Sequence, residues 1–277
     1  MESTSSQRVQ IEKGVVCGTA GGRELRCDVF TPPAGTANGV GILLVHGGGW
    51  IQGDRSQLHG YGIFLGRSGY TSVACEYRLS GEAKWPAQLE DVKLALRWTR
   101  ANSAQLGIDP DKIAVWGNSA GAHLALMIGA TPDIDVFDGI GGHAGVPTHV
   151  AATIAFYAPT NLGVPRNPTV ESPQLADVVA ALLGKNASVE RIRGASPITY
   201  VSPKFPPTML LTGNNDVLVP ADESLRMYRA LIGAGARAEL HVYEGAPHAF
   251  DAQPKYGRQC ASTIQLFLER HIPGTAQ

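Results

Sequence analysis

A serine set between two glycines is the pattern in this sequence with the clearest chemical use. The run Gly117-Asn118-Ser119-Ala120-Gly121 follows the apolar segment 113–116 and precedes a stretch of small apolar residues. A nucleophilic serine on a sharp turn from strand to helix needs small residues two positions before and after it, and this run provides them. The start of the helix would also offer free backbone amides to a developing negative charge. A tight turn with an incidental serine is the alternative, but the flanking strand and helix patterns favour a nucleophile.

Three consecutive glycines form a second unusual pattern. Gly47-Gly48-Gly49 lies between His46 and Trp50, directly after the apolar run 39–45. Such a run is costly in backbone entropy, so it needs a reason. The amides of Gly48 and Gly49, together with that of Ala120, could stabilise an oxyanion. A flexible turn or a phosphate loop are the alternatives, and the glycine pattern of a phosphate loop is missing.

A serine hydroxyl needs a base to remove its proton and an acid to orient that base. His248 lies in a loop that directly follows the strand-like segment 238–243, whereas His241 lies inside that segment. His271 lies at the end of the last predicted helix. Loops at the carboxyl ends of strands are where ligands collect in open α/β sheets. We therefore predict His248 as the base.

The acid is predicted by the same argument. Asp216 follows the strand-like segment 208–212, whereas Asp222 and Glu223 are typical first-turn residues of a helix. Asp251 is a fallback, although its closeness to the predicted base in sequence makes the geometry awkward. The order along the chain is then nucleophile, acid and base, which is the order found in α/β-hydrolases.

The segments around these residues alternate between strand and helix patterns. Short apolar or alternating runs predict strands at 8–16, 23–30, 39–45, 70–77, 112–116, 151–157, 208–212 and 238–243. One helix pattern begins at Pro86, and three others cover 119–128, 221–232 and 256–270. The first two strands flank the turn 20–22 and suggest an antiparallel pair. The remaining alternation predicts an α/β fold whose central, mostly parallel sheet carries helices on both faces.

Domain organisation follows from where these patterns stop. We predict a flexible N-terminus over residues 1–10 and a single domain over residues 11–273. Two Gly- and Pro-rich excursions, 131–150 and 161–207, are predicted near the site, and the second contains one short helix at 175–183. Long loops of this kind often carry function.

Composition excludes several classes of protein. The 277 residues carry a net charge of −1, which argues against nucleic acid or an anionic membrane as a partner. No apolar run is long enough for a transmembrane helix, and the polar start lacks a secretory signal if Met1 is the true start, so we predict a cytoplasmic protein. The four scattered cysteines are predicted to be reduced, with a Cys17–Cys27 disulfide as the less favoured alternative.

Cofactor and metal sites are not predicted. His143 and His149 lie in a Gly-rich stretch without an Asp, Glu or Cys arranged as a ligand set. The segment 139–144 has the glycine spacing of a dinucleotide fingerprint but follows no convincing strand. We therefore predict no metal and no cofactor.

Taken together, these motifs resemble the α/β-hydrolase esterases of the hormone-sensitive-lipase-like group, and more closely its bifunctional feruloyl/acetyl-xylan-esterase-like branch. The resemblance covers nearly the whole chain after about residue 10. It extends through the segments 46–54, 77–92, 107–125, 155–162 and 195–203. Asn118 stands where the lipase-like branch often has Asp, and Val217 stands where Pro usually follows the acid. The larger N-terminal helical cap of the lipase-like relatives is missing, which implies little or no cap.

The resemblance implies a serine carboxylesterase that hydrolyses short-chain or aryl carboxylic esters through an acyl-enzyme. It assigns the nucleophile, acid and base to Ser119, Asp216 and His248, and the oxyanion hole to Gly48, Gly49 and Ala120. We further predict substrate contacts from Trp50, Asn118, Tyr157 and Val219. Two alternatives stay open: an amide or formamide hydrolase with the same triad, and a non-catalytic α/β-hydrolase homologue that binds a small ligand. The sequence also leaves open whether the chain forms a homodimer.

Overall fold

The computed structural model describes residues 8–163 and 173–274, and these share one central β-sheet. Its strands are β1 (Gln10–Ala20), β2 (Arg23–Thr31), β3 (Gly41–Val45), β4 (Thr71–Cys75), β5 (Ile113–Asn118), β6 (Ala152–Phe156), β7 (Thr208–Gly213) and β8 (Ala238–Tyr243). They lie in the order β1-β2-β4-β3-β5-β6-β7-β8. The β1–β2 and β2–β4 pairs are antiparallel and the other pairs are parallel. The fold prediction is therefore confirmed, whereas residues 1–7 of the predicted flexible N-terminus lie outside the described residues.

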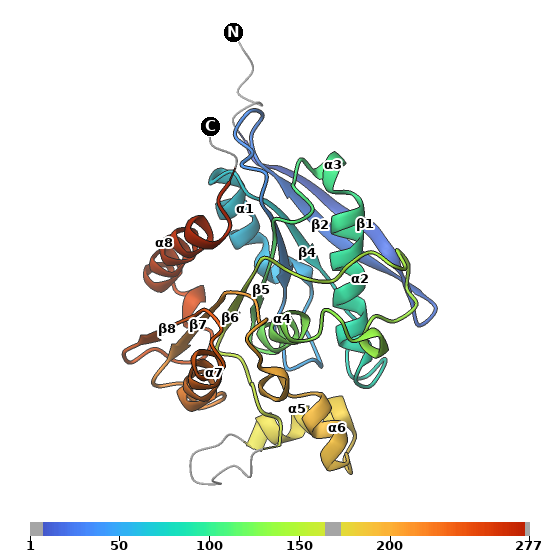
Figure 1. Cartoon of the computed structure of the whole chain (residues 1–277), viewed down its shortest axis with the longest axis vertical. Coiled ribbons are helices and arrows are strands. Elements are labelled where there is room, and N and C mark those ends of the chain that lie inside the picture. Colours follow the sequence, from blue (N-terminus) through green and yellow to red (C-terminus); the bar gives the residue numbers. More distant parts are fainter. Residues whose placement is uncertain (1–7, 164–172, 275–277) are drawn as a thin grey trace.

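Helices cover both faces of the sheet (Figure 1). They are α1 (His59–Arg67), α2 (Ala87–Ala101), α3 (Ser103–Leu106), α4 (Ala120–Ala130), α5 (Pro173–Leu183), α6 (Val189–Gly194), α7 (Ala221–Gly233) and α8 (Pro254–His271). Short 3-10 turns are η1 (Arg55–Leu58), η2 (Asp135–Phe137), η3 (Pro197–Tyr200) and η4 (Phe250–Ala252). Among the described residues, no helix has both the length and the apolar character needed to cross a membrane.

Strand β3 shows why the sheet is buried on both sides. Its Leu43 and Val45 pack in one core with residues of α2 and α4, while Ile42 and Leu44 pack in a second core with residues of α1 and α8. All five residues of the strand are buried. A parallel strand covered on both faces has no polar side, which explains its continuous apolar sequence.

Helices α1, α3 and α6 were not predicted from the sequence, and α1 shows one reason. The α1 segment HGYGIFLGR contains three glycines, which are weak helix formers, and this composition hides its helical pattern. Two of the glycines are needed for packing, because a Cβ at Gly62 would lie 2.7 Å from the ring of Phe30, and a Cβ at Gly66 would lie 2.7 Å from Val9. Close approach to the sheet therefore overrides the local propensity.

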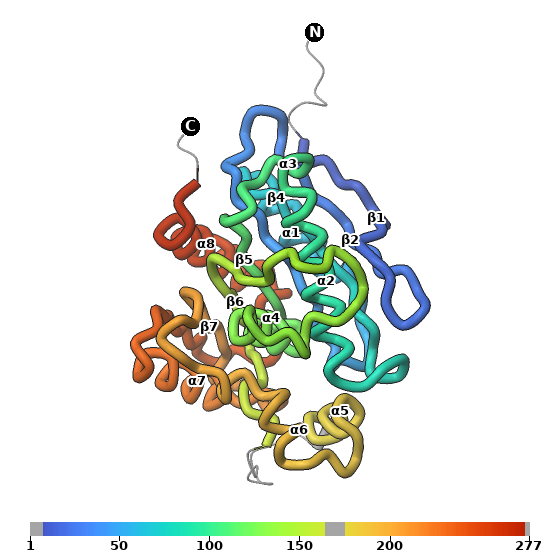
Figure 2. Tube along the Cα trace, turned by 45° about the vertical axis from the view of Figure 1, so that its right-hand side comes forward, coloured from blue at the N-terminus to red at the C-terminus, as the bar shows by residue number. Residues whose placement is uncertain are grey.

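The excursion 161–207 supplies α5 and α6 at one end of the molecule, beyond α4 (Figures 1 and 2). Lys84 Nζ donates to the carbonyl oxygen of Ala181 at 2.7 Å, and the Trp85 amide donates to that of Leu182 at 3.0 Å. The last four carbonyls of a helix have no partner inside it, so these bonds fix the end of α5 to the body of the protein.

The other excursion, 131–150, does not lie where it was predicted. Lys93 Nζ of α2 pairs with Asp138 Oδ1 at 2.8 Å, and Arg97 Nε of α2 donates to the carbonyl oxygen of Gly142 at 3.1 Å. Because the Lys93 ammonium is completely buried, it needs this carboxylate partner, and the segment is held along α2. None of its residues lines the catalytic cavity described below.

The four cysteines, Cys17, Cys27, Cys75 and Cys260, are buried and have free thiols. Cys27 of β2 is in register with Cys75 of β4. A hydrogen bond with the Cys17 side chain, together with burial, raises the pKa of Cys27. The less favoured Cys17–Cys27 disulfide is therefore not formed in this structure.

A buried histidine in α4 makes the stability of the fold depend on pH. His123 is fully buried, and burial lowers its pKa to about 4 from 6.5, although Nε2 bonds to the Ala195 carbonyl oxygen at 2.7 Å. Between pH 4 and 6.5 the unfolded chain therefore binds the proton that the folded protein excludes. The free energy of unfolding should therefore decrease as the pH is lowered through this window, by about 1.4 kcal/mol per pH unit for this one residue.

Urea unfolding at several pH values between 4.5 and 6 would measure this dependence. His123→Gln is expected to reduce the slope by the amount stated, whatever its effect on stability at neutral pH. The exposed His143→Asn is the matched control, since its ring is open to solvent in the folded state and Asn tolerates its left-handed backbone. An unchanged slope in His123→Gln would contradict the prediction.

Candidate active site

The predicted nucleophile occupies a sharp turn between β5 and α4. Ser119 has φ 54° and ψ −118°, a conformation rare for a residue other than glycine. A Cβ at Gly117 would lie 2.1 Å from the carbonyl oxygen of Gly121, and a Cβ at Gly121 would lie 2.1 Å from that of Val45. Close approach of backbone to backbone is thus the steric reason for a glycine on each side of the serine.

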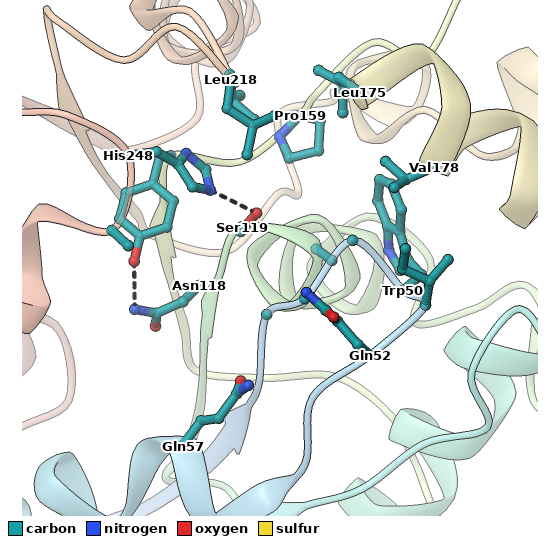
Figure 3. A pocket seen from close by; sticks show the side chains of 18 of the residues that line it. Trp50, Gln52, Gln57, Asn118, Ser119, Pro159, Leu175, Val178, Leu218 and His248 are labelled. Carbon is teal, nitrogen blue, oxygen red and sulfur yellow. Dashed lines mark hydrogen bonds between the residues drawn. The ribbon is translucent and has the colours of Figure 1, made fainter. Parts of the chain in front are cut away.

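A chain of hydrogen bonds joins the three residues predicted as a triad. His248 Nε2 lies 3.0 Å from Ser119 Oγ (Figure 3), and His248 Nδ1 lies 2.6 Å from Asp216 Oδ2. With Nδ1 donating to the carboxylate, Nε2 is left free to accept the serine proton. The structure therefore brings together Ser119, Asp216 and His248, which follow β5, β7 and β8 at the carboxyl edge of the sheet.

Asp216 is held rigidly in the loop after β7. Its side chain is completely buried, and Oδ1 accepts from the amides of Leu218 at 2.9 Å and Val219 at 2.8 Å. These bonds direct the second oxygen toward the imidazole. Asp222 is exposed at the start of α7, and Asp251, the fallback acid, bonds to other side chains instead.

The glycine loop after β3 lines the same cavity as Ser119. Gly48, Gly49 and Ala120 line this cavity together with Ser119, and within the described part of the chain their amides donate to no other group. Gly48 has φ 109°, and a Cβ there would lie 2.1 Å from the carbonyl oxygen of Gln52. Backbone amides that have no other partner are the kind of donor that an oxyanion hole uses, and the assignment of these three amides stays a prediction.

His46 holds this loop in place through contacts of its ring and its backbone. Its ring stacks on Tyr77 with centroids 4.3 Å apart, and Nδ1 lies 2.7 Å from the carbonyl oxygen of Gly47. Tyr77 Oη donates to the carbonyl oxygen of His46 at 3.0 Å. Burial lowers the pKa of His46 to about 4, so the ring stays neutral near pH 7.

The cavity beside the triad has a volume of about 620 Å³ and two chemically different sides. Figure 3 shows apolar side chains along one side of Ser119 and polar side chains along the other. The apolar side is formed by Trp50, Pro159, Leu175, Val178 and Leu218. The polar side includes Gln52, Gln57 and Asn118. An ester bound at Ser119 would therefore meet an apolar surface on one side of its carbonyl and hydrogen-bonding groups on the other.

The four residues predicted to contact substrate all line this cavity: Trp50, Asn118, Tyr157 and Val219. Contact with a substrate stays a prediction for each of them. Other lining residues were missed: Tyr61 comes from the unpredicted α1, whereas Leu175 and Val178 come from α5. For α5 a signal existed, because the predicted helix 175–183 lies in an excursion expected near the site.

Metal binding has no support among the residues that the structure describes. No group of three or more His, Cys, Asp or Glu side chains there is placed to hold a metal ion. His143 and His149 are both exposed. The chemistry that the described site offers is that of a hydroxyl, an imidazole, a carboxylate and backbone amides.

Comparison with known proteins gives the family. The family model described as BD-FAE matches residues 27–231, most of the chain. The chain belongs to the BD-FAE family. The probable carboxylic ester hydrolase LipM of Mycobacterium tuberculosis is 32% identical over 209 residues, which are 73% of this chain and 48% of LipM. The versiconal hemiacetal acetate esterase of Dothistroma septosporum is 32% identical over 241 residues, which are 83% of this chain and 70% of that protein.

A solved esterase structure shares the fold of this BD-FAE protein. The apo form of Thermogutta terrifontis esterase 2 matches with a TM-score of 0.81 at 23% identity, and the match covers 97% of each chain. The resemblance to hormone-sensitive-lipase-like esterases is confirmed by the family match and by these relatives, which are named as ester hydrolases. It spans between 48% and 62% of the length of the first curated relatives that it matches.

Proposed function

We propose that this BD-FAE protein is a serine carboxylesterase that hydrolyses short-chain or aryl carboxylic esters through an acyl-enzyme. The observation that carries the proposal is the hydrogen-bond chain Ser119–His248–Asp216 on the wall of a cavity that Gly48, Gly49 and Ala120 also line. The esterase names of its relatives agree with this chemistry. A non-catalytic homologue would have no need for an intact chain of nucleophile, base and acid.

The geometry accounts for each step of such a reaction. Ser119 Oγ attacks the ester carbonyl carbon while its proton moves to His248 Nε2, and Asp216 stabilises the imidazolium that results. The carbonyl oxygen, now negative, is held by the amides of the glycine loop and of Ala120, each such donor being worth about 3 kcal/mol in comparable sites. The tetrahedral intermediate then breaks its bond to the alcohol, which leaves with the proton from His248. Water activated by the same imidazole hydrolyses the acyl-serine.

Trapping the acyl-enzyme tests the proposal. The protein is mixed with p-nitrophenyl acetate, quenched in acid and digested, and the peptides are analysed by mass spectrometry. We expect an acetyl group on the peptide that contains Ser119, and none on that peptide from the Ser119→Ala variant. Acetylation elsewhere only, together with hydrolysis of the ester, would contradict the assignment of the nucleophile.

The substrate class is tested by comparing matched aryl esters and anilides. An esterase should turn over the ester far faster, whereas an amide or formamide hydrolase should not show this preference. A fluorophosphonate probe separates both enzymes from a non-catalytic homologue, which should not react with it. A cytoplasmic location stays a prediction from the sequence, and whether the chain forms a homodimer stays open.

A further inference from the structure

A buried group of polar side chains lies against the catalytic cavity and is not used by the mechanism above. We call it the Asp251 cluster: Asp251, Asn118, Tyr61 and Tyr157. Asp251 Oδ2 accepts from Asn118 Nδ2 at 2.7 Å and from Tyr61 Oη at 2.8 Å, and its Oδ1 accepts a short bond from Tyr157 Oη. Asn118 Nδ2 also lies 3.0 Å from Tyr157 Oη (Figure 3). All four side chains line the cavity, and Asp251 is only 8% exposed.

The partners of this carboxylate are all neutral. Among the described residues, no Lys, Arg or His pairs with Asp251, so three hydrogen bonds alone compensate its burial. Burial and the nearby carboxylate raise the pKa values of Tyr61 and Tyr157, which keeps both hydroxyls protonated as donors. A buried carboxylate without a cation is costly, and such groups are found where the structure needs them.

The cluster joins segments that carry the reacting groups. Asn118 directly precedes Ser119 at the end of β5, and Asp251 lies in η4, the turn that follows His248. The ring of Tyr157, the residue after β6, packs against the His248 imidazole with centroids 4.5 Å apart. The carboxylate therefore connects the side chain of the residue before the nucleophile to the loop that carries the base.

Backbone conformations around the cluster show that this connection is under constraint. Ser119, Tyr157 and Ala249 have φ values of 54°, 39° and 57°. Each is a member of the Asp251 cluster or lies beside a residue of the cluster or the triad. Residues other than glycine keep such conformations only where their surroundings hold them.

We propose that Asp251 is a positioning residue for hydrolysis, whose carboxylate fixes the His248 loop to the nucleophile turn so that the imidazole stays within reach of the Ser119 hydroxyl. The inference rests on the proposed serine mechanism. It concerns the orientation of the base and not substrate contact, so it predicts a loss in kcat with little change in KM.

Asp251→Asn tests this role with minimal change in volume. An amide has one acceptor oxygen and adds a donor, so it cannot accept from all three partners. We expect kcat for p-nitrophenyl acetate to fall about 10- to 100-fold, the range for small misplacements of catalytic groups, while KM changes less than about twofold. Asp133→Asn, an exposed carboxylate away from the cavity, is the matched control and should leave both values unchanged.

A charge swap separates positioning from general destabilisation. Asn118→Asp places two carboxylates within hydrogen-bond distance and should lower kcat as well. The double variant Asn118→Asp/Asp251→Asn restores one amide and one carboxylate with their positions exchanged, and Trp116 Nε1, 2.9 Å from Asn118 Oδ1, can still donate to residue 118. We expect its kcat to return to within about threefold of the wild-type value, as strong coupling between contacting residues requires.

If kcat of Asp251→Asn equals that of the wild type, or if the double variant combines the two single losses without recovery, the proposal is overturned. Should Asp251→Asn fail to fold, Tyr157→Phe decides the matter: it removes one bond to the carboxylate but keeps the ring against His248, and kcat must fall at constant KM. Failure of the serine mechanism itself is seen separately, as turnover retained by Ser119→Ala, and would overturn both proposals.

Discussion

Replacing Ser119 with alanine is expected to lower kcat/KM for p-nitrophenyl acetate by at least about 10³-fold. The hydroxyl is the atom that forms the acyl bond, and no other hydroxyl in the described residues lies within hydrogen-bond distance of His248 Nε2. The melting temperature should change little, because the side chain lost is small and alanine keeps the same backbone geometry. Initial rates and thermal unfolding of the same preparations measure both quantities.

Two further variants control this experiment. Ser262→Ala removes an exposed hydroxyl from α8 and should retain full activity. Ser119→Gly should be as inactive as Ser119→Ala but more stable by about 1 kcal/mol, because glycine adopts φ 54° without strain. Turnover near the wild-type rate in either variant of Ser119 would exclude it as the nucleophile.

Asp216→Asn is expected to lower kcat by about 10³- to 10⁴-fold, without loss of the loop structure. The asparagine oxygen can still accept from the amides of Leu218 and Val219, so its NH₂ group must face His248. Nδ1 then has to accept that bond, and the proton of the neutral imidazole moves to Nε2. In this tautomer His248 cannot accept the proton of Ser119.

Steady-state kinetics and the melting temperature of Asp216→Asn test this argument. Asp222→Asn, which changes an exposed carboxylate at the start of α7, should leave kcat unchanged. If Asp216→Asn stays within about tenfold of the wild-type kcat, the base is oriented by another group. Asp251→Asn should lose less kcat than Asp216→Asn, because we propose that Asp251 positions the loop of the base whereas Asp216 bonds to the base itself.

The residues that we propose as the triad could be predicted because the turn and strand patterns that position them are visible in the sequence. Gly117 is required by a backbone contact with Gly121 inside the motif, and Gly121 is required by a backbone contact with Val45 of the neighbouring strand, so a glycine at each position indicates the turn. Asp216 and His248 each follow an apolar strand, and parallel strands bring their carboxyl ends to one edge of a sheet. Their meeting with Ser119 therefore follows from topology, which strand patterns largely predict.

Other parts of the site could not be found in this way. Helix α1 contains three glycines, which conceal it, yet it supplies Tyr61. Asp251 was considered only as a substitute for the triad acid, and nothing in its neighbours indicates a bond to Asn118 or Tyr157. The position of the excursion 131–150 was predicted wrongly because the burial of Lys93, which holds it along α2, has no sequence pattern.

By itself the sequence determined the architecture of the sheet and singled out the residues that we propose as nucleophile, base and acid, because these depend on turn sterics and on strand order. Only the tertiary structure decided which side chains surround Ser119, including Val178 from α5 and the carboxylate of Asp251. The physical reason is distance along the chain: the Asp251–Asn118 bond joins residues 133 positions apart. Such a bond is stable only when packing has already brought both groups out of water, and packing is a property of the whole fold.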